Sequence, residues 1–284
     1  MMFFCIMQWA QILAFLKTHT AKWYSKSEQE SIARRLVEDL SGTSFMRWKL
    51  NQMPTLDEQV LQNYLNELAT GKPLQYVLGY EYFSGMTLRV NEHVLIPRPE
   101  TDELVQWIVS ECSTSPHRVL DMGTGSGCIA LGLKKACPQF IVHALDVSEN
   151  ALAVARENAR EQGLSVEFHV HDILLPTWPF SEPFTLWVSN PPYILLEEKN
   201  DMTPQVLEHE PHTALFVSNH NALQFYMAIE AHFQREAPQG AYLFFELSAQ
   251  AEAIVAYFKN KEQYIMHTRH DMYGKMRMLC LIKK

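Results

Sequence analysis

The stretch Arg118-Val-Leu-Asp121-Met-Gly123-Thr-Gly125-Ser-Gly127 decides the fold class. Its apolar beginning predicts a buried strand over residues 118–122, and the three alternating glycines predict a tight turn that opens a helix. Glycine has no Cβ, so the backbone of such a turn can approach a ligand closely. Ligands of open α/β sheets lie beyond the carboxyl ends of the strands, where this turn falls. The turn, residues 123–127, is therefore the first candidate binding site.

Strands and helices alternate along the rest of the C-terminal part. Further strands are predicted over residues 140–147, 165–170, 184–189 and 240–247, with helices such as 149–162 and 221–236 between them. Buried parallel strands covered by helices are typical of a doubly wound α/β fold. Residues 264–268 and 276–282 predict a closing hairpin. We therefore expect one α/β domain over residues 99–284.

The N-terminal part has a different pattern. Apolar residues at helical spacing predict a small helical-bundle domain over residues 1–72, and Ser27–Glu30 fits a capping box that would begin one of its helices. Residues 73–98 are aromatic and β-branched from Leu74 onward, with Ser84-Gly85 in the middle, and predict a β-hairpin connector. The helical domain contains no cluster of titratable groups that would indicate a site, although it offers a surface on which a large substrate could dock.

Composition limits the classes of partner. The 284 residues contain 24 Lys and Arg against 32 Asp and Glu, a net charge of −8, which disfavours a protein whose main partner is nucleic acid.

The five cysteines lack C-x-x-C spacing, so free thiols in a reducing cytoplasm are expected. No apolar run is long enough to span a membrane. His169-Val-His171 has no further ligand at useful spacing in the sequence, so we expect no metal. We expect a cytoplasmic monomer.

Two aspartates follow the next predicted strands. Asp146 lies 23 residues beyond Gly123, where an acidic side chain can hold ribose hydroxyls, and Asp172 can accept from the exocyclic amine of an adenine. Asp172 is equally compatible with a plain turn residue. A pattern scan would also match Gly125–Ala130 to a nicotinamide motif. These features indicate an adenosine-bearing cofactor without separating a dehydrogenase from a methyltransferase.

Asn190-Pro191-Pro192-Tyr193, at the end of the fourth predicted strand, decides between these classes. Two prolines cannot continue a strand ladder, so they fix a stiff loop. In that loop the Asn190 side-chain oxygen and the Pro191 carbonyl can point together into the cleft. Two acceptors side by side match the two hydrogens of a planar –NH2 group, and Tyr193 can lie against the flat face of that group. The alternative interpretation is a simple turn that ends a strand.

Together, Asp-x-Gly-x-Gly-x-Gly, Asp146 and Asn-Pro-Pro-Tyr resemble the class I methyltransferases that use S-adenosylmethionine to methylate planar amino groups. Within that class the chain resembles the HemK/PrmC family, the protein-glutamine methyltransferases of class-1 peptide chain release factors. The motifs that carry the resemblance are Pro73–Gly79, Ile96–Val105, Glu210–Leu215 and Asp271–Arg277. The resemblance covers about residue 71 to the end. Glu246-Leu-Ser departs from the family, which often has Gly after the Glu.

The resemblance implies a fold, a reaction and a set of roles. The fold is Rossmann-like, with a mostly parallel seven-stranded sheet, and the products are S-adenosylhomocysteine and a methylated release factor. The implied catalytic residues are Asn190, Pro191 and Tyr193, and the implied substrate contacts are these three with Pro192. The implied cofactor contacts are Gly123, Thr124, Gly125, Ser126, Gly127, Asp146, Asp172, Ile173 and Asn190. Asp121 would support the contact to the cofactor's methionine amine from outside the layer of residues that touch the cofactor. Arg98, Glu100 and Thr101 would border the pocket.

Three other functions compete with this one. An adenine amino-methyltransferase acting on DNA or RNA would use the same Asn-Pro-Pro-Tyr chemistry on a flipped base, but the net charge of −8 disfavours it. A nicotinamide dehydrogenase would leave Asn-Pro-Pro-Tyr without a purpose. A non-enzymatic binding module would explain neither the glycine turn with its aspartates nor Asn-Pro-Pro-Tyr.

Overall fold

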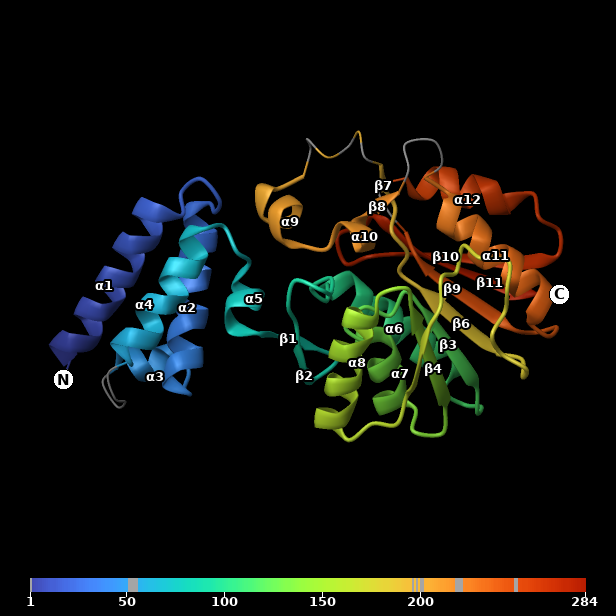
Figure 1. Cartoon of the computed structure of the whole chain (residues 1–284), viewed down its shortest axis with the longest axis horizontal. Coiled ribbons are helices and arrows are strands. Elements are labelled where there is room, and N and C mark those ends of the chain that lie inside the picture. The colour runs from blue at the N-terminus through green and yellow to red at the C-terminus, as the bar shows by residue number, and fades with distance from the viewer. Residues whose placement is uncertain are drawn as a thin grey trace. The chain divides into compact units, whose positions relative to one another are not determined.

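The computed structural model describes residues 2–50, 56–195, 197, 199, 202–217, 222–247 and 250–284. The chain divides into two compact units (Figure 1). One comprises Met1–Gly79 together with Met202–His209, and the other comprises Tyr80–Asp201 with Glu210–Lys284. The division at residue 79 falls inside the predicted connector. The first unit therefore includes a segment taken from far along the sequence.

The first unit is helical and has its own core. Ile12, Leu16, Leu36 and Leu68 are fully buried in it. In the returning segment, the Gln205 side-chain amide donates to the Trp23 carbonyl. The helices are α1 (Met2–His19), α2 (Lys26–Ser41), α3 (Phe45–Lys49), α4 (Glu58–Ala69), α5 (Leu74–Leu78) and α9 (Pro204–His209).

The capping box of α2 lies two residues before its predicted place. Ser25, not Ser27, is the N-cap, with extended backbone angles, and its Oγ accepts from the Glu28 amide. The Glu28 carboxylate accepts in turn from the Ser25 amide at 2.7 Å. The prediction at Ser27–Glu30 was wrong because Ser25 and Glu28 satisfy the same spacing one half-turn earlier.

The predicted strand at Leu74 was also wrong. Residues 74–78 form the short helix α5, which begins after Pro73 and ends at Gly79, whose φ is +80°. Tyr76 and Val77 are buried in it. Aromatic and β-branched residues favour strands only when a pleated surface is there to receive them, and here the helical core receives Val77 instead. The hairpin itself is present, with β1 (Tyr80–Phe83) antiparallel to β2 (Met86–Arg89).

The second unit contains the predicted seven-stranded, mostly parallel sheet. Its strand order is β10-β11-β9-β6-β3-β4-β5, and only the pairs formed by β11 are antiparallel. The chain runs from β3 outward to β5 and then returns to place β6 on the other side of β3, so the order reverses between β3 and β6. The strands are β3 (Arg118–Met122), β4 (Ile141–Asp146), β5 (Glu167–Val170), β6 (Leu186–Ser189), β9 (Tyr242–Glu246), β10 (Tyr264–His270) and β11 (Met276–Lys283).

Helices cover both faces of this sheet (Figure 1). Alternate strand residues enter the two cores: Val119 and Phe244 face one side, and Leu120 and Phe245 face the other. The first side holds α6 (Pro99–Cys112), α7 (Cys128–Ala136) and α8 (Glu149–Gln162), and the second holds α11 (Gln224–Glu236) and α12 (Ala251–Lys259). The class I methyltransferase fold predicted from the sequence is confirmed.

A small two-stranded sheet was not predicted. It pairs β7 (Ile194–Leu195) with β8 (Phe216–Val217) in parallel, directly after the Asn190 loop, and α10 (His212–Leu215) precedes β8. Pairs of two residues are too short to give a periodic signal in the sequence. Among the described helices, none has both the length and the apolarity needed to cross a membrane.

Candidate functional site

A cavity opens at the carboxyl ends of the strands, where the strand order reverses. It measures about 800 Å³ when counted out to its open mouth. This is the place where ligands bind in doubly wound sheets. Eight of the residues expected from the sequence line it: Gly123, Gly125, Asp146, Asp172, Ile173, Asn190, Pro191 and Pro192. The sequence did not indicate other parts of its wall, among them His93, Val94, Leu95, Val147, Ser148, Phe225 and Ile229.

The glycine turn forms the floor of the cavity beyond β3. Gly123 and Gly125 have φ values of +73° and +54°, and no atom lies within 4 Å of a Cβ built on either. A side chain there would strain the backbone and project into open space. Gly127 also has a positive φ, +83°, and in addition a Cβ there would lie 3.2 Å from the Cβ of Ala155. Two amides of the turn, those of Gly123 and Thr124, donate to the Leu145 carbonyl and tie the turn to β4.

Asp146 holds the turn from the end of β4. Its Oδ2 accepts from the Gly125 amide at 2.9 Å, and its Oδ1 accepts from the Ser148 amide at 2.9 Å. Burial raises the pKa of this carboxyl, and the backbone amides that it accepts from oppose that rise. Carboxylate oxygens can accept further hydrogen bonds, so Asp146 can hold a hydroxyl group in the cavity while it fixes the turn.

Asp121 and two residues of the turn itself, Thr124 and Ser126, are not part of the cavity wall. The Thr124 hydroxyl donates to Asp121 Oδ2 at 2.6 Å, and the Ala130 amide donates to the same oxygen. Asp121 Oδ1 is buried without a partner among the described residues, as is the Ser126 hydroxyl. Burial raises the pKa of Asp121 to about 7. When Asp121 is ionised, this second oxygen can accept a further hydrogen bond.

The loop after β5 carries Asp172 and Ile173. Asp172 Oδ1 accepts from the Leu174 amide at 2.9 Å, which is the turn role that its residue type favours, and the residue also lines the cavity. His232 of α11 holds the loop from below, because its Nε2 lies 3.2 Å from the Ile173 carbonyl and 3.0 Å from the Leu175 carbonyl. No sequence pattern indicated His232, which is an isolated histidine on a helix.

The Asn190 loop leaves β6 at the cavity edge. The Ser189 hydroxyl donates to the Met122 carbonyl at 2.7 Å and joins this edge to β3. Asn190 Nδ2 lies 3.4 Å from Thr101 Oγ1, while its Oδ1 and the Pro191 carbonyl have no donor among the described residues. Tyr193 is not part of the cavity wall and packs half-buried against the core, where burial raises its pKa to about 12.

The residues around Arg98 lie beside this loop rather than on the cavity wall. Arg98 Nη2 makes an ion pair of 2.6 Å with Glu210 Oε1, and the Glu210 side chain is 1% exposed. Thr101 is buried, and its hydroxyl donates to Glu246 Oε2 at 2.7 Å. Glu100 lies close enough to raise the pKa values of Glu246 and Tyr193 through its charge. The start of α6 therefore places charged and hydrogen-bonding side chains next to the Asn190 loop.

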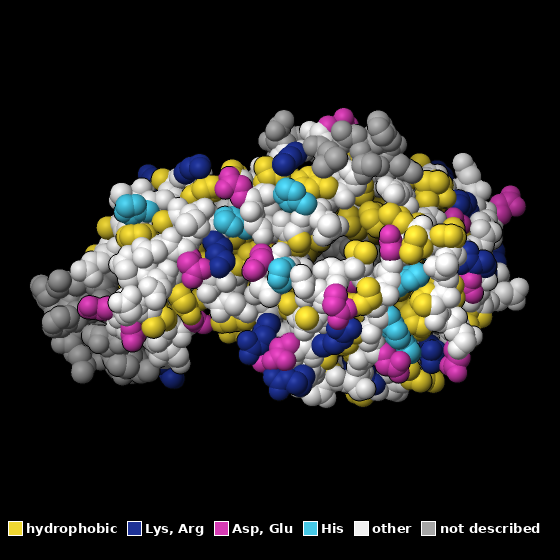
Figure 2. Space-filling view, in the orientation of Figure 1, with side chains coloured by type: hydrophobic (Ala, Val, Ile, Leu, Met, Phe, Trp, Pro, Cys, Tyr) yellow, Lys and Arg dark blue, Asp and Glu magenta, His cyan; other side chains and the backbone are white. Residues whose placement is uncertain are grey.

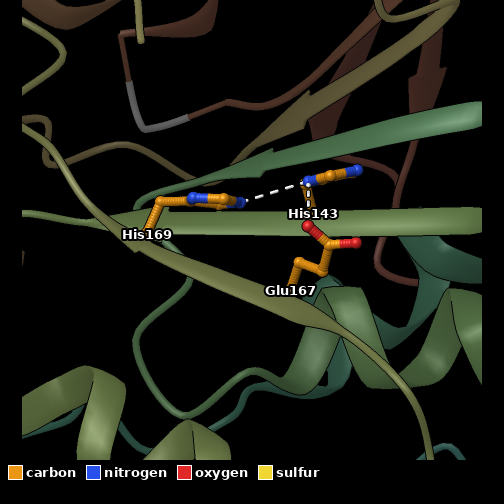
Figure 3. Close-up of side chains that lie close together, drawn as sticks. All are labelled: His143, Glu167 and His169. Carbon is orange, nitrogen blue, oxygen red and sulfur yellow. Dashed lines mark hydrogen bonds and ion pairs between the residues drawn. The ribbon is translucent and has the colours of Figure 1, made fainter. Parts of the chain in front are cut away.

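A second group of ligand-type side chains lies on neighbouring strands (Figure 3). His143 Nδ1 of β4 is 3.1 Å from His169 Nε2 and 3.4 Å from Glu167 Oε2 of β5. Burial lowers the pKa of both imidazoles, so they are neutral near pH 7 and can share one hydrogen bond. We interpret the group as a cross-strand pairing, because its polar contacts join its own members.

The donor set of the cavity fits an adenosyl cofactor. The open backbone at Gly123 and Gly125 leaves room for an extended chain, and Asp146 and Asp172 offer acceptors for hydroxyl and amino groups. Ile173, Phe225 and Ile229 supply apolar surface for a flat ring. These features are those of a nucleoside site with acidic recognition groups.

Comparison with known proteins identifies the family. Residues 98–221 match the family model "Methyltransferase small domain". The release factor glutamine methyltransferase of Flavobacterium psychrophilum is 40% identical over 228 residues, covering 78% of this chain and 80% of that protein. That of Streptococcus pneumoniae is 36% identical over 279 residues, covering 97% and 98%. A methyltransferase from Pyrococcus furiosus shares the fold, with a TM-score of 0.52 at 16% identity over 70% of this chain and 89% of that one. The chain belongs to the release factor glutamine methyltransferase family.

Proposed function

We propose that the chain transfers a methyl group from S-adenosylmethionine to the side-chain amide nitrogen of the glutamine in the Gly-Gly-Gln loop of class-1 release factors. One observation carries the proposal. Asn190 and Pro191 line the cavity, and neither Asn190 Oδ1 nor the Pro191 carbonyl accepts a hydrogen bond from the described residues. Two acceptors on a stiff loop, both left unpaired by the described residues, match the two hydrogens of a carboxamide.

The two acceptors also explain the chemistry. An amide nitrogen is a poor nucleophile because its lone pair is delocalised into the carbonyl. Hydrogen bonds from its –NH2 to Asn190 and Pro191 favour a more pyramidal nitrogen and stabilise the positive charge that grows there. A preorganised contact of this kind is typically worth about 3–4 kcal/mol. We assign Pro192, which lines the cavity, to the wall against which the flat carboxamide lies. We assign Tyr193, which packs half-buried next to Pro192 outside that wall, to the same substrate contact.

The cofactor, when bound, supplies a methyl group on a cationic sulfur. The residues of this chain then have to bind and align it. We assign Gly123–Gly127 to its close approach, Asp146 to its ribose hydroxyls, and Asp172 with Ile173 to its adenine. Asp121 would face the methionine amine from behind the turn, where its unpartnered oxygen awaits a donor. Arg98, Glu100 and Thr101 would border the reacting centre.

We assign substrate docking to the helical unit. The segment 202–209, which follows the Asn190 loop in the chain, belongs to that unit. The helical unit and the Asn190 loop are therefore close to each other in the sequence. On the face that Figure 2 shows, Lys and Arg are interspersed with Asp and Glu, which suits a protein partner better than nucleic acid. We further propose that the enzyme works as a monomer in the cytoplasm, where release factors act.

Mass spectrometry tests the proposal. A release factor incubated with the full chain and S-adenosylmethionine should gain one methyl group, located on the glutamine of its Gly-Gly-Gln peptide. A release factor in which that glutamine is replaced by glutamate is the control and should gain none. An unmodified peptide under saturating cofactor would overturn the proposal. Transfer to a bare oligonucleotide would point instead to the adenine amino-methyltransferase.

A further inference from the structure

The side-chain amide of Asn190 could face the cavity in two ways. Its oxygen and nitrogen have nearly the same shape, so the neighbouring groups decide which of them points outward. Only one orientation presents Oδ1 to a substrate –NH2 group. The opposite orientation would present the Nδ2 hydrogens of Asn190 to the hydrogens of the substrate –NH2 group, and the two groups would repel each other. The groups that contact the Asn190 amide therefore decide whether it can accept from the substrate.

The Thr101 hydroxyl is the group behind Asn190. Its single hydrogen is donated to Glu246 Oε2 at 2.7 Å. Above about pH 7, where Glu246 is ionised, the carboxylate can only accept and the direction of this hydrogen bond is fixed. Towards Asn190, at 3.4 Å, the Thr101 oxygen can then offer only a lone pair. Asn190 must turn its Nδ2 to Thr101, and its Oδ1 is left facing away from that contact.

Glu246 is held firmly enough to enforce this arrangement. It is the last residue of β9, next to β6, and Phe245 pairs with Ser189, so Glu246 and Asn190 leave adjacent strands at the same level. The Tyr226 hydroxyl donates to the Glu246 carbonyl at 2.9 Å and fixes its backbone. Glu246 and Thr101 are 5% and 3% exposed, so water does not compete strongly for their hydrogen bond.

We infer that Thr101 and Glu246 are positioning residues that orient the Asn190 carboxamide, with Glu246 fixing the Thr101 hydrogen and Thr101 fixing Asn190 Nδ2. The inference rests on the proposed function for its effect on methyl transfer. The orientation itself is a property of the free enzyme and can be measured without a substrate.

The kinetic test replaces Thr101 in the full chain. Thr101→Val keeps the shape of the side chain and removes its hydroxyl, so kcat should fall by at least about tenfold, while the dissociation constant of S-adenosylhomocysteine changes less than about threefold. Thr101→Ser restores the hydroxyl and should recover most of the loss. Thr185→Val is the matched control, because that hydroxyl contacts His117 instead, and it should leave kcat unchanged.

The spectroscopic test follows the amide directly. With 15N-labelled asparagine, the Asn190 side-chain resonances, assigned through Asn190→Ala, should shift and exchange faster in Thr101→Val but not in Thr101→Ser. Unchanged Asn190 resonances in folded Thr101→Val, or a kcat within twofold of the parent, would overturn the inference. A parent enzyme that transfers no methyl group would instead overturn the proposed function and leave the spectroscopic result standing on its own.

Discussion

The Gly125 amide donates to Asp146 Oδ2 across 2.9 Å, so two residues expected to bind the cofactor also bind each other. The bond connects the turn after β3 to the end of β4, its parallel neighbour in the sheet. A cofactor held by Asp146 would thus be held by a carboxylate whose direction the glycine turn already fixes. Preorganisation of this kind lowers the entropic cost of binding.

Asp146→Asn should weaken cofactor binding. Asn can offer only one acceptor oxygen to the two amides that Asp146 now serves, those of Gly125 and Ser148. We expect the dissociation constant of S-adenosylhomocysteine, measured by calorimetry, to rise at least about tenfold, which is about 1.4 kcal/mol. Glu149→Gln, an exposed change three residues later, is the control. Equal affinity in the two variants would refute the role of Asp146.

Asn190→Ala should abolish transfer and leave the fold intact. The change removes one acceptor for the glutamine –NH2 group from a partly exposed loop, so no core contact is lost. We expect kcat to fall at least about a hundredfold, with thermal unfolding unchanged. The exposed Asn150→Ala in α8 is the control. Turnover within about tenfold of the parent would contradict the proposed role, since that corresponds to only about 1.4 kcal/mol.

His232→Phe should raise the KM for the cofactor more than it lowers kcat. Arg235 Nη2 lies 2.9 Å from His232 Nδ1 and can only donate, so the ring hydrogen is on Nε2, where it faces the Ile173 and Leu175 carbonyls. Phe keeps the ring stacked on Trp178 but loses this donor. Loss of about 1 kcal/mol of hydrogen bonding predicts a rise in KM of about fivefold.

The exposed His267→Phe on β10 is the control for that experiment, because it adds the same ring without touching the loop after β5. Steady-state kinetics with varied S-adenosylmethionine gives both constants. A fall in kcat at unchanged KM would show that His232 does not act through the cofactor loop.

The sequence predicted the parts of the fold whose signal is local. The strand at 118–122 and the helix at 149–162 have the predicted bounds. An apolar run and a capped amphipathic segment can both be recognised from neighbouring residues alone. Residues 74–78 became a helix because packing overrode the strand preference of their side chains. Thr101 and Glu246, 145 residues apart, could not be linked from the sequence, since only the sheet brings them together.

Arg98→Ala should destabilise the second unit. It would leave the Glu210 carboxylate buried without its cationic partner, and the second oxygen of Glu210 already has no partner among the described residues. Because the Arg98 side chain is 36% exposed and only Glu210 is buried, we expect a loss of about 1–3 kcal/mol, the usual cost of leaving a buried polar group without its partner. Arg160→Ala breaks the exposed pair with Glu157 and should cost less than about 1 kcal/mol. Urea unfolding of the two variants measures the difference, and equal losses would contradict the prediction.

Glu246→Gln should become more stable relative to the parent protein as the pH rises. Burial raises the pKa of Glu246 from 4.5 to about 7, with the Thr101 hydrogen bond, Arg277 and Arg98 opposing the rise and Glu100 adding to it. Between these two values the folded protein binds more protons than the unfolded chain. Stability therefore falls with rising pH across this window, and the loss is complete above the folded pKa.

Gln keeps an acceptor for the Thr101 hydroxyl and cannot ionise, so the variant should escape that loss. We expect its unfolding midpoint, relative to the parent, to be higher at pH 8 than at pH 4, with the change concentrated between about pH 4.5 and 7. Asp121, whose pKa is also about 7, remains in both proteins and cancels in the comparison. A midpoint difference that stays constant with pH would show that Glu246 has the same pKa in the folded and unfolded states. Burial would then not desolvate its carboxylate.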